Sequence, residues 1–314
     1  MGKNVLVVGG AGFIGGAVTD LLLLAQQHSV RVYDTLLFED YYHKPLDFVR
    51  GDIRDHEQLQ KHLDWADVVI WLAALVADGA CDLTPDLALE FNDRSVQWLS
   101  EHFDGRIIFP SSCLVYKMSQ GVLDESSAVD PSTMYTKTKY SAEDYLKNKN
   151  AVVFRLSTLF GIGDAYSRVR LDLVVNLLTA KAAVDHSMTI FGGRQSRPFV
   201  HVRDVAQAMV GAVDSSVTGL FNLHTQNMTI LDLAKKVAEH VPDASLDVQE
   251  KPLSETGDYR MNSDKARGVL GFQPRYTLDD GIKQVLEVIH RGRVKDIHHP
   301  RYSNERFLKI NPLT

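Results

Sequence analysis

The sequence has few of the features that mark secreted, membrane or nucleic-acid-binding proteins. Only two of its 314 residues are cysteines, Cys81 and Cys113, which are too few for a disulfide framework and favour a reducing, cytoplasmic location. No apolar run reaches the roughly 18–20 residues of a transmembrane helix. We expect no signal peptide, because the chain starts directly on an apolar strand. The net charge is −6, so we expect neither a nucleic-acid nor a membrane partner.

The composition is otherwise that of an ordinary folded protein. Apolar residues make up 45% of the chain and charged residues 24%. A chain of this length can form one large α/β domain or two unequal ones. The order of the residues therefore has to indicate the function, because the composition does not.

The N-terminal stretch has the pattern of a strand, a tight glycine turn and a helix. The apolar run from Val5 to Val8 leads into glycines, and an amphipathic segment follows. Gly9, Gly12 and Gly15 fit G-x-x-G-x-x-G, and starting from Gly10 the spacing also fits G-x-G-x-x-G. Glycines permit positive φ angles and let backbone N–H groups at a helix start approach a pyrophosphate. The pattern predicts a dinucleotide-binding turn, and a glycine turn without a ligand is the alternative.

An acidic residue follows at the distance that a dinucleotide-binding fold requires. Asp34 ends a second strand-like segment, residues 30–33, about 20 positions after the turn. Its carboxylate can accept hydrogen bonds from both hydroxyls of an adenosine ribose, and it would repel a 2′-phosphate. We therefore expect NAD rather than NADP as the cofactor. The alternative is that Asp34 is a surface acid.

Further strand-like segments alternate with helical ones through the first half of the chain. Strand patterns occupy residues 49–55, 67–74, 106–110 and 152–157, and helical patterns include residues 85–103 and 168–183. This alternation predicts an α/β protein with a Rossmann-type, doubly wound parallel sheet. We expect residues 1–165 to form the NAD-binding domain, which the chain rejoins at about 200–224. Residues 166–314 would form mainly a smaller C-terminal α/β substrate-binding domain.

Ligands of such sheets lie at the carboxyl ends of the strands, and several suitable residues fall there. Asp52 and Ile53 follow the third strand, where the acid could bond an adenine amine and the isoleucine could pack on the ring. The alternative role for Asp52 is to cap the helix that follows. Leu72, Ala73 and Ala74 end the fourth strand, where small residues leave room for the cofactor backbone.

Tyr135 and Lys139 are four positions apart and so share one face of a helix. A phenol with a pKa of about 10 exchanges protons poorly at neutral pH, and a neighbouring ammonium would lower that pKa. Ser112, at a strand end, could hydrogen-bond the same substrate oxygen. Together they could take a proton from a sugar hydroxyl as hydride leaves its carbon, or return it to a ketone. The alternative is an ordinary surface pair.

Five arginines gather after the sixth strand, at positions 168, 170, 194, 197 and 203. On an acidic protein, guanidinium groups are suited to hold a substrate diphosphate. We assign Arg197 to this role and expect some of the others to be solvated.

The tail, residues 293–300, is basic and rich in histidine. We predict no metal site there, because no third ligand is placed beside His298 and His299. A solvated tail, or one that contacts a second subunit, is expected instead.

Taken in order, these motifs resemble the extended short-chain dehydrogenase/reductase family, in its NAD-dependent sugar-nucleotide epimerase/dehydratase branch, which includes enzymes of the UDP-glucose 4-epimerase type. The likeness spans nearly the whole chain. The matching pieces are Gly9-Gly10-Ala11-Gly12-Phe13-Ile14-Gly15, Gly51-Asp52-Ile53, Leu72-Ala73-Ala74, Asn92, Ser111-Ser112, Val115-Tyr116, Tyr135 with Lys139, Arg197, residues 199–205 and residues 278–282.

The resemblance implies a role for each matching residue. The catalytic residues would be Ser112, Tyr135 and Lys139. NAD would be bound by Gly9, Gly12, Phe13, Ile14, Gly15, Asp34, Asp52, Ile53, Leu72, Ala73, Ala74 and Asn92, together with Tyr135 and Lys139. The nucleotide-diphosphate sugar would contact Ser112, Asn176, Arg197 and Arg260. The family also implies a homodimer formed through two helices of each subunit.

One departure from the family pattern bears on the reaction. Cys113 and Leu114 occupy positions where 4,6-dehydratases and decarboxylases of the family carry an acidic residue, just before Val-Tyr. The usual base for deprotonation at C5 is therefore missing, which disfavours a dehydratase. Cys113 could act as an acid in an unusual dehydration, but a buried, inert thiol is the favoured interpretation.

The sequence predicts NAD-dependent oxidoreduction at C4 of a nucleotide-diphosphate sugar, by a 4-epimerase that works through a 4-keto intermediate in carbohydrate biosynthesis. The alternative is a nucleotide-sugar 4-dehydrogenase or 4-keto reductase, because residues 170–176 and 258–260 resemble a subgroup that includes bacterial GDP-heptose 4-dehydrogenases. A non-catalytic nucleotide-binding protein is the remaining alternative, since a fold does not fix a function.

Overall fold

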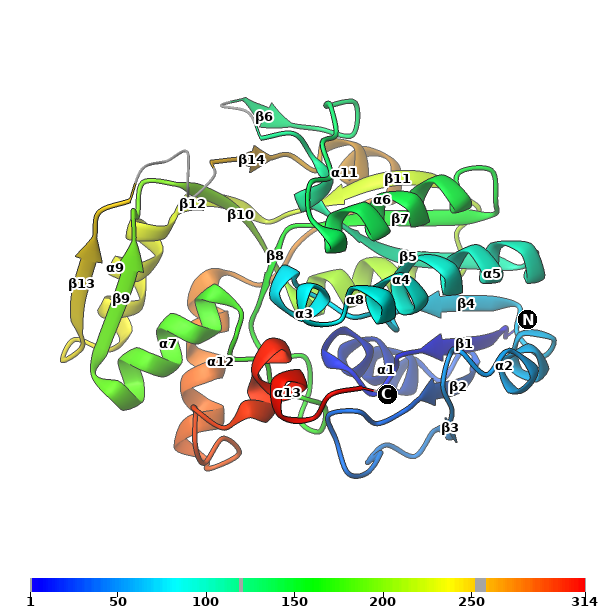
Figure 1. The fold of residues 1–314 in the computed structure, drawn as a ribbon, viewed down its shortest axis with the longest axis horizontal. Helices are drawn as coiled ribbons and strands as arrows, with labels where there is room; N and C mark the ends of the chain where they lie inside the picture. Colours follow the sequence, from blue (N-terminus) through cyan, green and yellow to red (C-terminus); the bar gives the residue numbers. More distant parts are fainter. Residues whose placement is uncertain (1, 119–120, 252–257, 314) are drawn as a thin grey trace.

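The computed structural model describes residues 2–118, 121–251 and 258–313, and a seven-stranded parallel sheet lies at its centre (Figure 1). The strand order is β11-β7-β5-β4-β1-β2-β3, and every neighbouring pair is parallel. The strands are β1 (Asn4–Val8), β2 (Ser29–Asp34), β3 (Asp47–Arg50), β4 (Val68–Trp71), β5 (Arg106–Ser112), β7 (Ala151–Leu156) and β11 (Gly219–Leu223). The predicted doubly wound sheet is confirmed, and its order reverses at β1, where such sheets bind their ligands.

Helices cover both faces of this sheet, because its strands are apolar on both sides. Alternate residues of β1 belong to different apolar clusters: Val5 and Val7 to one, Leu6 and Val8 to the other. The first cluster includes α1 (Phe13–Ala25) and α8 (Val202–Gly211). The second includes α2 (His56–Leu63), α5 (Ser95–His102) and α6 (Met134–Leu146).

A smaller part of the molecule lies beside the large sheet, and it is built from the remaining strands and the helices that pack on them. Its strands are β8 (Thr158–Phe160), β10 (Ser196–His201) and β12 (Gln226–Thr229) in one sheet, β9 (Ser187–Phe191) with β13 (Ser245–Gln249), and β6 (Val122–Leu123) with β14 (Arg260–Met261). Its helices are α7 (Val174–Asp185), α9 (Ile230–His240) and α12 (Leu278–His290). Helix α11 (Asp264–Leu270) packs against β11 of the large sheet, and α13 (Asn304–Ile310) packs against α3 (Asp78–Leu83). A separate apolar cluster joins α7, α9 and α12.

Three expected elements differ from the structure. The expected helix over 85–103 is α4 (Pro85–Leu89) and α5, joined by a π-helical turn, Glu90–Arg94. The expected helix over 168–183 begins only at Val174, because residues 168–171 are all buried and the N–H of Leu171 donates to the carbonyl of Tyr302 instead of to a helical partner. The tail, residues 293–300, is expected to be solvated or to contact a second subunit, but part of it packs on the chain itself: Val294 is buried, and Arg293 donates to the carbonyls of Asp164 and Ser167.

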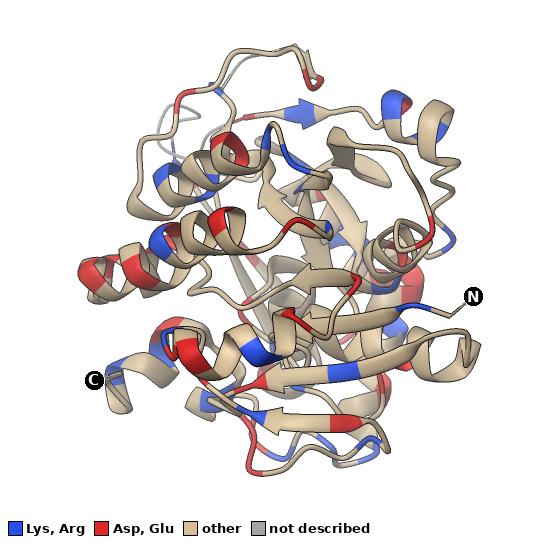
Figure 2. Ribbon diagram, turned by 90° about the vertical axis from the view of Figure 1, so that its right-hand side faces the viewer, with Lys and Arg blue, Asp and Glu red and all other residues tan. Residues whose placement is uncertain are grey.

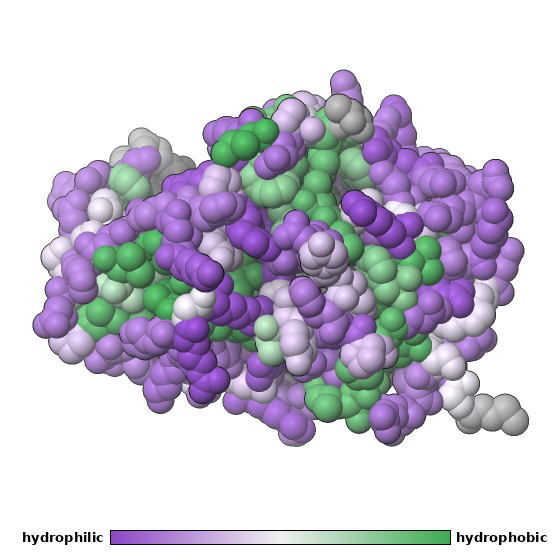
Figure 3. All heavy atoms as spheres, turned by 90° about the horizontal axis from the view of Figure 1, so that it is seen from below, coloured by the Kyte–Doolittle hydropathy of each residue, from purple (hydrophilic) through white to green (hydrophobic). Residues whose placement is uncertain are grey.

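The surface mixes charges of both signs. Figure 2 shows acidic and basic residues interspersed over the helices and loops of one side. Figure 3 shows apolar residues gathered in patches among hydrophilic ones on the lower side. Among the described residues, no helix combines the length and the apolar character that crossing a membrane requires.

Candidate active site

A cavity of about 740 Å³ runs along the carboxyl ends of the central strands. Sequence-predicted residues on its wall are Gly9, Gly12, Phe13, Ile14, Gly15, Asp34, Asp52, Ile53, Leu72, Ala73, Ala74, Ser112, Tyr135 and Lys139. The structure thus brings together residues from six separate segments. A volume of this size is in the range of small-molecule sites in proteins.

The glycine turn after β1 has little space for side chains where it meets its neighbours. Gly9 has a φ of +83°, and a Cβ there would lie 2.5 Å from the backbone nitrogen of Ala73. A Cβ on Gly15 would lie 2.6 Å from the Cα of Gly10, so the helix could not pack against the turn. At Gly12 the nearest atom would be the Gly9 carbonyl oxygen, at 3.3 Å. The turn therefore fits a dinucleotide, because its backbone forms the cavity wall at the start of α1.

Asp34 lies at the end of β2 and is held by backbone N–H groups. Its Oδ2 accepts from the N–H of Ala11 at 2.9 Å, and its Oδ1 accepts from that of Leu36 at 2.8 Å. Burial raises the pKa of Asp34, although these two hydrogen bonds oppose the shift. The carboxylate is thus fixed on the cavity wall between the glycine turn and the segment after β2, as binding of a ribose requires.

Asp52 faces Arg54 rather than capping the next helix. The Nη2 of Arg54 lies 2.8 Å from Oδ2 of Asp52, and the helix cap is Asp55, which accepts from the N–H of Gln58. Burial would raise the pKa of Asp52, but hydrogen bonds from Arg54 outweigh it and lower that pKa. The capping alternative for Asp52 is therefore wrong. Ile53 beside it is buried and lines the cavity.

Ser112, Tyr135 and Lys139 meet at the other end of the cavity. The Thr133 side chain caps α6, and this places Tyr135 in its first turn and Lys139 one turn later. The Ser112 hydroxyl hydrogen-bonds the phenol of Tyr135 and accepts from the N–H of Leu114 at 3.2 Å. The Lys139 ammonium donates to the Pro110 carbonyl at 2.9 Å.

The expected lowering of the Tyr135 pKa by Lys139 is not what the structure shows. Burial raises the pKa of Tyr135, and the opposing influences are the hydrogen bond with Ser112 and the charge of Arg170. Burial also lowers the pKa of Lys139 to about 8. Burial thus disfavours the charged forms of both groups. A polar ligand in the cavity would have to stabilise these charged forms before the two groups could exchange protons at neutral pH.

Asn92 does not line the cavity. It lies in the π-helical turn, where its Oδ1 accepts from the N–H of Leu75 at 2.8 Å and its Nδ2 donates to the carbonyl of Leu75 at 2.7 Å. Both polar atoms of the amide are thus used to hold the loop after β4. The structure therefore shows Asn92 holding Leu75, which itself lines the cavity, and the expected direct contact of Asn92 with the cofactor stays a prediction.

The three other predicted substrate contacts also lie off the cavity wall. Asn176 is fully buried and pins the backbone of Gly161 and Arg170 through its amide. Arg197 lies over the ring of Tyr259, with 4.7 Å from its Cζ to the ring centroid. Arg260 is exposed in β14. The structure therefore gives Asn176 a structural role, and it brings Tyr259 to the wall between Arg197 and the cavity.

Two groups of residues on the cavity wall were not predicted from the sequence. Arg168 and Arg170 line the wall, although Arg197 was chosen from the same arginine-rich region. The C-terminal segment contributes Asn304, Leu308, Pro312 and Leu313. The spacing of Ser303 ahead of Phe307 and Leu308 was the available signal, since a serine cap before paired apolar residues is typical of a short amphipathic helix.

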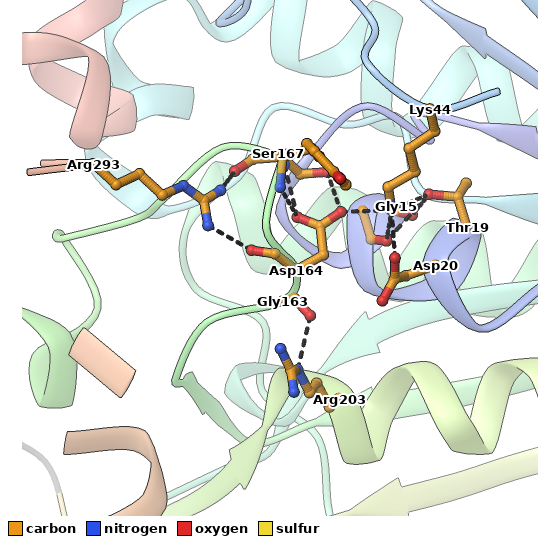
Figure 4. A network of polar contacts seen from close by, with 11 residues as sticks. Gly15, Thr19, Asp20, Lys44, Gly163, Asp164, Ser167, Arg203 and Arg293 are labelled. Carbon is orange, nitrogen blue, oxygen red and sulfur yellow. Dashed lines mark hydrogen bonds and ion pairs between the residues drawn. The ribbon is translucent and has the colours of Figure 1, made fainter. Parts of the chain in front are cut away.

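A buried ion pair holds the segment that leads to these arginines (Figure 4). The Lys44 ammonium lies 2.5 Å from the Asp164 carboxylate, and it also donates to the Gly16 carbonyl of α1. Arg293 donates to the carbonyls of Asp164 and Ser167. The start of α1 and the segment before Arg168 are thus fixed to each other beside the cavity.

Cys113 and Leu114 lie on the cavity wall next to Ser112. Cys113 is 3% exposed, and burial raises the pKa of its thiol to about 12. The acidic residues on the described wall are Asp34, Glu39 and Asp52, at the far end from Tyr135. No carboxylate of the described wall is therefore beside the Ser112 hydroxyl.

Comparisons with known proteins agree with this geometry. The model of the NAD dependent epimerase/dehydratase family matches residues 5–223. A UDP-glucose 4-epimerase of Rhizobium meliloti (strain 1021) is 29% identical, over 88% of this chain and 94% of that protein. UDP-glucuronic acid decarboxylase 1 of Danio rerio is 23% identical, over 91% of this chain and 73% of that protein.

Solved structures give the same result. A UDP-glucuronic acid 4-epimerase from Bacillus cereus, in complex with UDP-glucuronic acid and NAD, superimposes with a TM-score of 0.78 and 25% identity, over 92% of this chain and 99% of that one. The family match covers most of the chain and includes the glycine turn, Tyr135 and Lys139. The protein therefore belongs to the NAD dependent epimerase/dehydratase family.

Proposed function

We propose that this chain is an NAD-dependent nucleotide-sugar 4-epimerase. The observation that carries the proposal is one continuous cavity with the Asp34 carboxylate at one end and Ser112, Tyr135 and Lys139 at the other. The first end suits an adenosine ribose, and the second provides proton-transfer groups beside the place for a sugar. The names of the relatives, which include UDP-sugar 4-epimerases, support the same substrate class.

In this mechanism NAD supplies, when bound, a hydride acceptor that becomes a hydride donor once reduced. Tyr135 accepts the proton of the sugar 4-hydroxyl, and later returns that proton to the oxygen of the 4-keto sugar. Ser112 hydrogen-bonds the same oxygen and the phenol, so it keeps the two in line. Arg170 supplies positive charge that favours the transient phenolate, against the burial that disfavours it, and the Lys139 ammonium is held at the same end of the cavity by the Pro110 carbonyl.

Dehydration and decarboxylation are disfavoured alternatives, although decarboxylases are among the relatives. The dehydration route needs a base at C5, and the described wall beside Ser112 offers Cys113 and Leu114 instead. The Cys113 thiol stays protonated at neutral pH, because burial raises its pKa to about 12. A 4-dehydrogenase or 4-keto reductase would use the same residues, but it would produce or consume NADH in each turnover, whereas an epimerase would not.

Different segments of the chain would bind the two ligands. Residues 1–165, with 200–224, would bind NAD, and residues 166–314 would mainly contact the nucleotide sugar. Arg170 on the cavity wall is a candidate contact, and Arg197 and Arg260 stay predicted contacts although they lie off this wall. Both described cysteines are free and buried, which suits the cytoplasm. A homodimer is also proposed, and the native mass in solution tests it.

The decisive experiment is an account of NADH during turnover with a panel of UDP-, GDP- and dTDP-sugars. An epimerase converts a sugar to its 4-epimer with no net NADH and no external oxidant. Stoichiometric NADH or accumulation of a 4-keto sugar would refute the epimerase and favour the dehydrogenase.

A pair of variants tests the role of Tyr135. Tyr135→Phe should lower kcat by about 10²–10⁴-fold with NAD binding retained. The matched control is Tyr140→Phe, because Tyr140 lies on the same helix and is 39% exposed. Equal activity of the two variants would show that the catalytic assignment is wrong.

A further inference from the structure

The C-terminal segment crosses the cavity instead of leaving the molecule. We call residues 299–313 the C-terminal strap; it contains a short 3-10 turn, Pro300–Tyr302, and α13. Figure 1 shows α13, in red, lying between α12 and the helices and loops at the carboxyl end of the large sheet. Four strap residues line the cavity: Asn304, Leu308, Pro312 and Leu313.

Asn304 connects two walls of the cavity. Its Nδ2 donates to the carbonyl of Val76, after β4, at 2.9 Å. Its Oδ1 accepts from Nη1 of Arg168 at 2.5 Å, and its backbone N–H donates to Asp172 at 2.9 Å. One buried side chain thus joins the loop after β4 to the segment before α7, across the mouth between them.

A third wall is tied down by Arg301 and Phe307. Nη2 of Arg301 lies 2.7 Å from the Glu39 carboxylate, in the segment after β2. The rings of Phe307 and Phe38 pack with centroids 4.8 Å apart. The segment after β2 follows Asp34, so the strap covers the same end of the cavity that suits the adenosine ribose.

The strap also reaches the catalytic end. Leu308 is buried and belongs to one apolar cluster with Leu75 and Tyr135. The strap therefore contacts both ends of the cavity and not only its rim.

Arg168 gives the covered region a positive charge. Its side chain stacks on Phe38, with 3.5 Å from Cζ to the ring centroid, and the carbonyl of Arg301 accepts from its Nε at 3.0 Å. Its Nη2 is buried and has no hydrogen-bond partner among the described residues. A buried guanidinium on the cavity wall favours a bound anion, and a dinucleotide carries a diphosphate.

We propose that the C-terminal strap retains the bound dinucleotide between turnovers, with Asn304 as the residue that holds the strap closed. This inference rests on the proposed function for the identity of the ligand. Release of a dinucleotide on the strap side requires breaking the contacts of Asn304 with Val76 and Arg168. Retention suits an epimerase, which restores its cofactor in each cycle, whereas a dehydrogenase must exchange it.

The test measures release of NADH from the full chain. Protein loaded with NADH is mixed with excess NAD, and the loss of bound NADH fluorescence gives the release rate. Asn304→Ala and Phe307→Ala should each release NADH at least about tenfold faster than the wild type, with association changed much less. The control is Lys309→Ala, because Lys309 lies on the exposed face of α13, where it pairs with Glu305 of the same helix.

Release rates within twofold of the wild type in both variants would overturn the proposal, as would a wild type that binds no NADH. A lower melting temperature without faster release would mean that the strap only stabilises the fold, and would also overturn it. If Asn304→Ala does not fold, Phe307→Ala decides. Failure of the proposed function is separate: fast release in the variants with no epimerised sugar in the wild type would refute the epimerase and leave the strap in place.

Discussion

Replacing Lys44 with methionine is expected to destabilise the protein by about 3 kcal/mol. The side chains of Lys44 and Asp164 are only 2% and 1% exposed, and removal of one partner of a buried pair typically costs about 3–5 kcal/mol. Asp164 would keep its hydrogen bonds from the N–H groups of Tyr166 and Ser167, which is why the low end applies. In a chain of this size the melting temperature should fall by roughly 5–10 °C.

The assay is urea unfolding of the wild type, Lys44→Met, Asp164→Asn and the double variant at pH 7. The double variant should lose less free energy of unfolding than the sum of the single losses, by at least about 1 kcal/mol. Lys61→Met is the control, because the pair of Lys61 with Glu57 is exposed and should be worth less than about 0.5 kcal/mol. Additive losses, or a loss in Lys44→Met no larger than in the control, would refute the argument.

The same pair predicts a pH dependence with a definite sign. Burial would raise the pKa of Asp164, but the charge of Lys44 outweighs it and lowers that pKa. A carboxylate with a lowered pKa stabilises the fold above its unfolded pKa of about 3.9, and this contribution is lost as pH falls through the folded value. The stability difference between the wild type and Lys44→Met should therefore be constant at pH 6–8 and shrink below about pH 4.

Three further predictions concern the cavity. Lys139→Met should abolish turnover but raise the free energy of unfolding at pH 7 by up to about 3 kcal/mol, because burial lowers the pKa of Lys139 to about 8 and so makes its charged form unfavourable in the folded state. This gain should vanish as the pH rises from about 8 to 10.4, because the wild-type lysine loses its proton over that range. Asn92→Ala should weaken NADH binding about tenfold in a fluorescence titration, since both backbone groups of Leu75 lose their partner. Gly9→Ala should lower the melting temperature, whereas Gly268→Ala, in an open helical position, should raise it slightly; equal shifts would contradict the steric argument.

The sequence was sufficient for the sheet and for most of the cofactor side of the cavity. Glycine spacing, Asp34 and the strand ends carry local signals, because their roles depend on backbone position along single strands and turns. The pair Tyr135 and Lys139 was also found, since its spacing follows from helix geometry alone.

The substrate side was predicted less well, because it depends on contacts between distant segments. Asn176 and Arg168 belong to the same stretch, but only packing decides that the amide points to backbone groups and the guanidinium to the cavity wall. The raised pKa of Tyr135 likewise follows from burial, which a residue spacing does not contain. The C-terminal strap meets Val76 across 228 positions of sequence, so no local pattern could place it.

The return of the chain to the large sheet with β11 has a consequence for synthesis on the ribosome. Strand β7 pairs with β5 on one side and with β11 on the other, and β11 ends at Leu223. While the intervening residues are being made, β7 presents an apolar, unpaired edge to the surrounding solution. A nascent chain halted at residue 165 should therefore be prone to edge-to-edge association, whereas one halted after α8 and β11 have emerged can close its own sheet.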